Sequence, residues 1–281
     1  MDLAELAQAN GLRRVGARPP LGKYLAETWR RRDFIYTMAK FRLRASLESG
    51  RLGVVWLLVR PCLDAAIYGA IFGVLQGPSI GPDYVARVTI GVFLFQFFTK
   101  SLSDGSKSIT GNRALVQSLA FPRLTLPLAK VVEQGLSTLP SIALLVVVIL
   151  PVQGHLPSVT WLLIIPLFVL YTLFNAGIAM IAARLTVHMR DLTQLLPFIS
   201  RILFYTSGVL FNVETIFKSH PWVVRVYDFH PLYQVLQLAR GALMGIECNL
   251  MYWVYFGTWS IVLSVGGLAF FWVAEERYGR D

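Results

Sequence analysis

The sequence predicts an all-helical protein that crosses the membrane six times, and three observations carry that prediction. The chain is 55% hydrophobic and only 15% charged, with a mean hydropathy of +0.57. From about residue 53 onward it reads as apolar segments of roughly 18 to 25 residues, each long enough to cross a hydrocarbon core of about 30 Å. Twelve of its 26 Lys and Arg residues fall within the first 60 positions. Because Lys and Arg near spans stay on the cytoplasmic side, we expect the N-terminus there.

The first part of the chain is predicted to stay outside the hydrocarbon core. Residues 1–22 read as a flexible cytoplasmic N-terminus, and residues 23–52 as a basic amphipathic helix lying in the membrane surface. In that helix Trp29, Phe34 and Phe41 belong to an apolar set that recurs near helical spacing. Its basic face consists of Arg30, Arg31, Arg32, Lys40, Arg42 and Arg44. An ordinary solvated basic tail is the alternative interpretation.

The membrane domain is predicted over residues 53–274, followed by a cytoplasmic tail at 275–281. Its six expected spans are 52–75, 84–102, 124–150, 159–183, 192–211 and 250–274. An even number of spans places both termini in the cytoplasm. The later Lys and Arg residues agree with this topology, because most lie at or near predicted cytoplasmic ends.

The segment between the last two spans, 212–247, is too mixed for a plain span and too apolar for a free loop. Pro221 and Pro231 divide it into short pieces, each with an apolar side. We expect two short re-entrant helices that dip into the outer leaflet, where protein must cover the backbone of the turn.

The sequence offers no catalytic, metal or nucleotide site. The nearest match to a phosphate-binding loop, at 16–24, has one residue too many between its glycines and lacks the Ser or Thr that would hold Mg²⁺. The four histidines lack metal-ligand spacing, although His220, Asp228 and His230 could meet. Nucleic acid is not an expected partner, because the basic residues lie where anionic lipid headgroups and cytoplasmic proteins would meet them.

Charged residues at membrane depth predict buried ion pairs, because an unpaired charge there costs about 2.5–3.5 kcal/mol. Asp64 and Arg201 fall at similar depths on the first and fifth spans. Arg60, one helical turn before Asp64, is the rival partner. Lys100 and Glu133 also match in depth, on the antiparallel second and third spans.

Four linked motifs resemble the membrane subunits of polysaccharide-exporting ABC transporters, the Wzm and TagG group of permeases. The resemblance covers about residues 42–245 and places the motifs in the right order on six spans. The motifs are RLRAS at 42–46 leading into LGVVW at 52–56 and Pro61; ALV at 114–116 with FPR at 121–123 and LPL at 126–128; MRDL at 189–192; and HPL at 230–232 with Arg240. His230 stands where the family usually has Asn. Within this group the actinobacterial branch that exports cell-wall galactan is the suspected relative.

The resemblance implies a homodimer in the cytoplasmic membrane, bound to two copies of a separate ATPase subunit that carries ATP and Mg. The substrate would be a polyprenyl-pyrophosphate-linked glycan, and this chain would hold no cofactor. A short cytoplasmic helix between spans two and three would meet the ATPase, which places it at 112–121. The residues expected to contact the ATPase are Arg42, Arg44, Asn112, Arg113, Leu115 and Phe121.

The same resemblance implies that spans one and five flank the channel, where flat aromatic rings would face the sugars. The channel-lining candidates are Tyr68, Phe72, Phe198, Phe204, Tyr205 and Phe211. Ordinary lipid or core packing is the alternative for each ring. Two other functions stay open: a permease for drugs or lipids alone, and a membrane-embedded glycosyltransferase, for which only Asp104 and Asp191 offer acids on cytoplasmic loops.

Overall fold

The computed structural model describes residues 19–48, 53, 55–76, 83–119, 121–153 and 158–275, without the side chains of 72, 75–76 and 146–153. Within these ranges the chain forms helices and no strands, which confirms the all-helical prediction. The helices are α2 (Leu21–Arg30), α3 (Arg32–Glu48), α4 (Val55–Gln76), α5 (Tyr84–Ser106), η2 (Thr110–Asn112), α6 (Arg113–Ser118), α7 (Thr125–Gln153), η3 (Val159–Leu163), α8 (Ile164–His188), α9 (Leu192–Thr206), α10 (Val213–Ile216), α11 (Pro221–Asp228), α12 (Pro231–Met244) and α13 (Met251–Val273).

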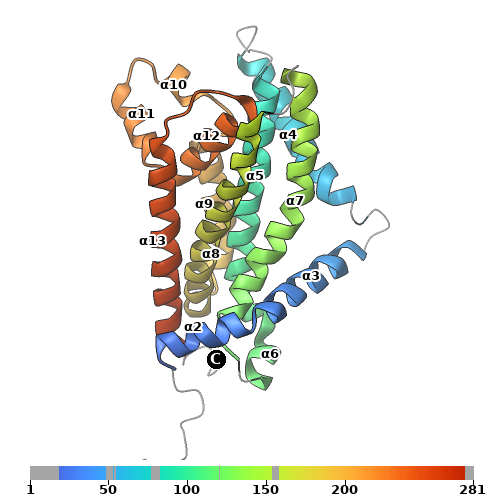
Figure 1. The fold of residues 1–281 in the computed structure, drawn as a ribbon, viewed down its shortest axis with the longest axis vertical. Helices are drawn as coiled ribbons and strands as arrows, with labels where there is room; N and C mark the ends of the chain where they lie inside the picture. The colour runs from blue at the N-terminus through green and yellow to red at the C-terminus, as the bar shows by residue number, and fades with distance from the viewer. Residues whose placement is uncertain are drawn as a thin grey trace, which may run out of the picture.

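The long helices run side by side along the long axis of the molecule (Figure 1). Helix α5 occupies the middle of the bundle, contacts α4, α7, α8, α9 and α12, and is buried along most of its length. Among the described residues, three helices are long and apolar enough to cross a membrane: α5, the joined η3–α8 (Val159–His188), and α13. A chain with several membrane-crossing helices is therefore supported, whereas the count of six goes beyond this finding.

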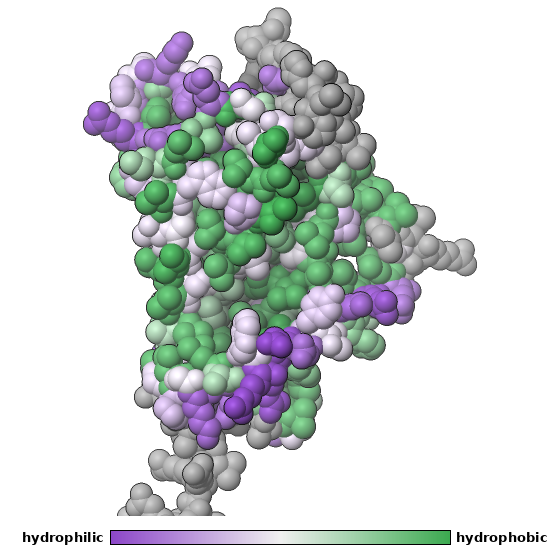
Figure 2. Space-filling model, in the orientation of Figure 1, coloured by the Kyte–Doolittle hydropathy of each residue, from purple (hydrophilic) through white to green (hydrophobic). Residues whose placement is uncertain are grey.

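Polar side chains gather at the two ends of the bundle. On the face drawn in Figure 2, apolar side chains cover the middle of the molecule, while hydrophilic ones lie over α10 and α11 at one end and over α2 and α3 at the other. The end of α13 lies at the same end as α2 and α6 (Figure 1). This distribution is typical of a bundle whose middle lies in hydrocarbon.

The expected surface helix at 23–52 is two helices in the structure. Helix α2 ends at Arg30, the backbone N–H of Arg31 donates to the carbonyl of Thr28, and α3 then begins at Arg32. Each helix has one buried side, with Tyr24 on α2 and Ala39 on α3. The other sides carry exposed aromatic and basic residues, as expected for helices at a membrane surface. Residues 1–18 of the predicted flexible N-terminus and 276–281 of the predicted tail lie outside the described residues. The N-terminus prediction extends too far, because Leu21 and Gly22 already belong to α2.

The predicted fifth span, 192–211, is too long by five residues, because α9 ends at Thr206. Gly208 has a φ of +72°, a backbone conformation that residues with a side chain rarely adopt. The buried guanidinium of Arg240 donates to the carbonyls of Gly208 and Val209, both at 3.0 Å. The side chain from α12 thus satisfies carbonyls of the turn that follows α9.

Three short helices, α10, α11 and α12, occupy the segment for which two re-entrant helices are expected. Pro221 and Pro231 each stand in the first turn of a helix, as their missing N–H favours. The Nδ1 atom of His230 accepts the backbone N–H of Tyr233 at 3.3 Å. His230 therefore caps α12, a role that Asn also fills at helix starts. Helix α12 itself is largely buried against α5, α8 and α13.

Candidate functional site

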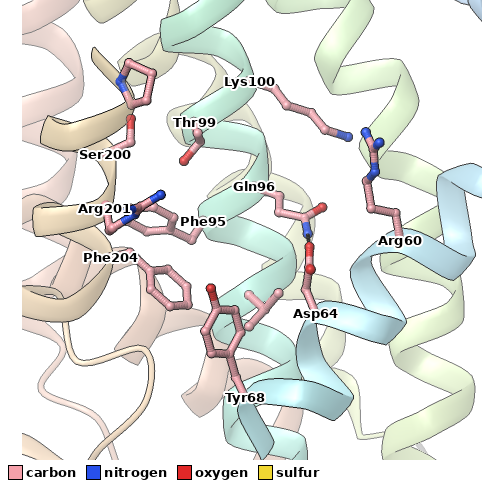
Figure 3. Close-up of a pocket in the computed structure, with 12 residues that line it drawn as sticks. Arg60, Asp64, Tyr68, Phe95, Gln96, Thr99, Lys100, Ser200, Arg201 and Phe204 are labelled. Carbon is pink, nitrogen blue, oxygen red and sulfur yellow. Dashed lines mark hydrogen bonds between the residues drawn. The ribbon is translucent and has the colours of Figure 1, made fainter. Parts of the chain in front are cut away.

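A cavity of about 340 Å³ opens between α4, α5 and α9, at the place where the sequence predicts an ion pair and a channel wall. Pro61 and Pro197 lie inside α4 and α9, and neither ends its helix. Figure 3 shows the side chains of the three helices converging on this space. The lining residues are Arg60, Asp64, Tyr68, Val92, Phe95, Gln96, Thr99, Lys100, Pro197, Ser200, Arg201 and Phe204.

The charged residues of the cavity do not pair as predicted. The carboxylate of Asp64 accepts a hydrogen bond from Nε2 of Gln96 at 2.7 Å, so its observed partner is a neutral amide. Among the described residues no salt bridge joins Asp64 to either arginine. Both charges nevertheless line the same space, so the predicted approach of α4 and α9 is present while the direct contact is not.

The second predicted pair, Lys100 and Glu133, is also not formed. Glu133 accepts instead from Lys130 at 2.8 Å, three residues earlier in α7, a contact that needs no tertiary packing. Lys100 extends into the cavity toward Arg60 and makes no hydrogen bond or salt bridge within the part of the chain that the structure describes (Figure 3). The next acid along α5, Asp104, accepts from Gln134 of α7 at 2.7 Å.

The aromatic candidates divide into three groups. The rings of Tyr68 and Phe204 pack against each other in the wall of the cavity, with centroids 4.9 Å apart, and Phe95 of α5 packs on Phe204 at 5.0 Å. Phe198 and Tyr205 lie on the outer side of α9 and are 63% and 46% exposed. Phe211 lies beyond the end of α9 and packs against the core, whereas the side chain of Phe72 lies outside the described residues.

Among the lining residues that are not sequence candidates, Gln96 and Phe95 contact candidates directly, since Gln96 bonds to Asp64 and Phe95 packs on Phe204. Both lie on α5, which reads as an ordinary apolar span. The amide of Gln96, one helical turn before Lys100, is the signal that could have extended the polar side of α5 toward the middle of the span.

The expected ATPase-contact residues cluster at one end of the bundle. Nη2 of Arg42 donates to Oδ1 of Asn112 at 2.6 Å, and the same amide donates to the carbonyl of Ser108 at 2.6 Å. Arg42 thus joins the surface helix α3 to the start of α6. The helix expected at 112–121 is shorter in the structure: η2 leads into α6, which ends at Ser118, and Leu119 is already extended.

The apolar members of this set pack inward. Leu115 and Phe121 lie half-buried against a small core at this end of the bundle, and the ring of Phe121 lies 6.2 Å from that of Phe34. Arg113, Arg44 and Leu119 are exposed, and Leu119 keeps 56% of its surface accessible. Arg113 at the start of α6 and Leu119 directly after its end are therefore exposed, whereas Leu115 and Phe121 hold this segment against the bundle.

A hydrogen-bonded latch ties three distant segments beside α6. The hydroxyl of Tyr24 donates to Glu275 at 2.7 Å and accepts the backbone N–H of Leu124 at 3.1 Å. The backbone N–H of Arg123 donates to the other carboxylate oxygen at 3.1 Å, and its guanidinium donates to the Glu275 carbonyl. Burial raises the pKa of the Glu275 carboxyl, and the contacts with Tyr24 and Arg123 offset this only in part. The latch joins α2, the start of α7 and the end of α13.

Within the described ranges no three His, Cys, Asp or Glu side chains gather as a metal ion would require. The arrangement instead offers a polar, partly aromatic space between helices, next to a basic end that is suited to a protein partner.

Comparison with known proteins agrees with this arrangement. The sequence model of the family described as ABC-2 type transporter matches residues 34–244. Two proteins named O-antigen export system permease protein RfbA, both from Klebsiella pneumoniae, are 28% and 27% identical over 249 residues, which is 88% of this chain and 94% of each relative. A protein of the same name from Myxococcus xanthus is 26% identical over 196 residues, or 69% of this chain and 74% of the relative.

Proposed function

The chain belongs to the ABC-2 type transporter family, and on that premise we propose that it is the permease subunit of an ATP-driven exporter of lipid-linked polysaccharide. The observation that carries the proposal is the similarity to O-antigen export permeases along nearly the whole of both chains. The substrate would be a glycan on polyprenyl pyrophosphate, of the O-antigen, teichoic acid or cell-wall galactan type. The cytoplasmic membrane is the expected location, with both termini inside.

Six spans would be supplied by α4, α5, α7, α8, α9 and α13. Helix α9, at 15 residues, is only about 22 Å long, and the short helices α10 to α12 would complete its crossing as a re-entrant segment. Helix α12 suits a re-entrant position because its polar ends are satisfied within the protein, by His230 at the start and Gly245 at the end.

A homodimer would form along α4 and α9. Both helices turn a row of apolar side chains away from the bundle, and these chains are about half or more exposed in the single chain. The exposed rows are Leu63, Ile67 and Ile71 on α4, and Phe198, Ile202 and Tyr205 on α9. Two such rows, brought together by two-fold symmetry, would enclose a passage with Tyr68 and Phe204 in its wall.

Two copies of a separate ATPase subunit would contact the permease at α6, where ATP hydrolysis would be coupled to movement of the bundle. Arg113, Leu119 and Arg44 offer a basic and apolar surface to that subunit. The inward packing of Leu115 and Phe121, the Arg42–Asn112 hydrogen bond and the latch at Glu275 join α6 to α3, α7 and α13. Movement of α6 would therefore be transmitted to the bundle.

We predict that Leu119→Asp uncouples ATP hydrolysis from export without unfolding the chain, because Leu119 is exposed and a charge there meets only the partner. The measurement is ATP hydrolysis and lipid-linked glycan transport by the purified complex in proteoliposomes. Val159→Asp, at an 81% exposed position far from α6, is the matched control. Unchanged coupling in Leu119→Asp would remove α6 from the ATPase interface.

A further inference from the structure

The cavity between α4, α5 and α9 holds more positive charge than its own acid can neutralise. Arg60, Lys100 and Arg201 line it together with the single carboxylate of Asp64, so its formal net charge is +2. None of the three cations makes a hydrogen bond or salt bridge within the described residues. Lys100 lies within electrostatic range of Arg60, whose like charge repels it, and of Asp104 and Asp64, which attract it without forming a salt bridge. Unpaired cations between helices are the arrangement expected where an anionic ligand completes the charge balance.

The depth of the three cations in the bundle limits which anionic ligands could reach them. Arg60 lies five residues into α4, Lys100 six residues before the end of α5, and Arg201 nine residues into α9. At about 1.5 Å per residue they lie about 8, 9 and 14 Å from the expected cytoplasmic ends of their helices. This is deeper than the ends of the helices, where headgroups of resident lipids lie. A phosphate that reaches all three cations must move in along the space between α4 and α9.

We propose that this cavity is the binding site for the pyrophosphate of the lipid-linked substrate as it leaves the cytoplasmic surface. A pyrophosphate diester carries a negative charge on each of its two phosphorus centres, which matches the net charge of the site. Guanidinium groups bind phosphate oxygens in a bidentate manner, and an ammonium acts as a point charge beside them. The proposal rests on the proposed function and adds the part of the substrate that the permease recognises.

The neighbouring rings fit the rest of such a substrate. Tyr68 and Phe204 lie on the side of the cavity away from Lys100 (Figure 3). A sugar attached to the pyrophosphate would pass over these rings, whereas the polyprenyl chain would stay in the lipid outside the gap between α4 and α9. Asp64, held by Gln96, would weaken the binding of an anion and so permit its release.

The test measures binding of radiolabelled undecaprenyl pyrophosphate to the complete complex in phosphatidylcholine nanodiscs. Each of Arg201→Gln, Lys100→Gln and Arg60→Gln is expected to weaken binding by about tenfold, the effect of one charge-assisted hydrogen bond. Arg201→Lys, which keeps the charge, should lose less than Arg201→Gln. Asp64→Asn should strengthen binding and slow export. Arg184→Gln is the matched control, because Arg184 is a cation at the same end of the bundle that packs on Phe270 of α13, away from the cavity.

Competition experiments distinguish a site for the pyrophosphate of the substrate from a site for the phosphate of a resident membrane lipid. Unlabelled undecaprenyl monophosphate should compete less well than the pyrophosphate, and phosphatidylglycerol hardly at all. Equal competition by phosphatidylglycerol would show a site for resident lipid and overturn the proposal. It would also be overturned if the three Gln variants bound the pyrophosphate as tightly as the unmodified complex while glycan export continued. Absence of ATP-driven glycan export by the unmodified complex would contradict the proposed function itself.

Discussion

Glu275 is a buried acid whose protonation should control how firmly the cytoplasmic end of the bundle is held. Its folded-state pKa is raised by burial, so the folded protein binds its proton more tightly than the unfolded chain does. The stability that this group contributes is full below the ordinary pKa of a glutamate and is lost as pH rises through the raised pKa. We expect the thermal midpoint of the purified protein to fall across that window. Glu275→Gln should flatten this part of the profile, and an unchanged slope in the variant would contradict the assignment.

Tyr24 is the centre of the same latch, because its hydroxyl bonds to both Glu275 and the backbone of Leu124. Tyr24→Phe keeps the ring and leaves two buried polar groups without this partner, so it should cost about 1–3 kcal/mol of stability. Denaturation of the reconstituted protein measures the loss. Tyr36→Phe, at a half-exposed position on α3, is the control and should change stability little. Equal effects of the two changes would mean that the latch contributes nothing.

Helices α8 and α13 cross at a distance that only glycine permits. A methyl group on Gly177 would lie about 2.4 Å from the backbone of Leu263, and one on Gly267 about 2.5 Å from the carbonyl of Gly177. Such close approach through small residues is typical of helix pairs in membranes. The crossing fixes α13, whose end carries the latch at Glu275.

We predict that Gly267→Ala lowers stability by about 1–3 kcal/mol, because the two helices must separate to admit the methyl group. Gly266→Ala is the matched control: it is the neighbouring position, and a methyl group there meets nothing within 4 Å. Thermal unfolding in detergent compares the two. If both alanines had the same effect, the close crossing would not be what joins α8 to α13.

The elements that the sequence predicts well are those with a continuous apolar run. The predicted second span begins at Tyr84, as α5 does, and the last begins within one residue of α13. The end of α9 was not predictable, because Arg240, which satisfies the carbonyls after it, lies more than 30 residues away. The latch was not predictable for the same reason, because Tyr24 and Glu275 are 251 positions apart and neither belongs to a motif.

Part of the cavity was predictable from the sequence. Asp64, Arg201, Tyr68 and Phe204 stand out because charges and rings are notable on apolar spans, and the structure brings them to one space. Their pairing was not predictable, because a neutral amide, Gln96, competes for the carboxylate and carries no charge signal in the sequence.

At the scale of the whole molecule, the orientation in the membrane follows from the basic residues near α2, α3 and α6. We predict that Ser158→Cys reacts with an impermeant thiol reagent applied to intact cells. Gln117→Cys, on the exposed side of α6, should react only after the membrane is made permeable. Labelling in the reverse order would contradict the proposed topology, and with it the placement of the ATPase at α6.

The central claim is that this chain forms a path for lipid-linked polysaccharide that a partner ATPase drives. The most direct measurement reconstitutes the chain with its ATPase in proteoliposomes and follows the appearance of a pyrophosphate-linked glycan on the far side of the membrane. The account predicts movement that needs ATP and this chain, and that stops with Leu119→Asp while the protein stays folded. Glycan movement that proceeds equally without this chain, or none with the complete and ATP-hydrolysing complex, would contradict it.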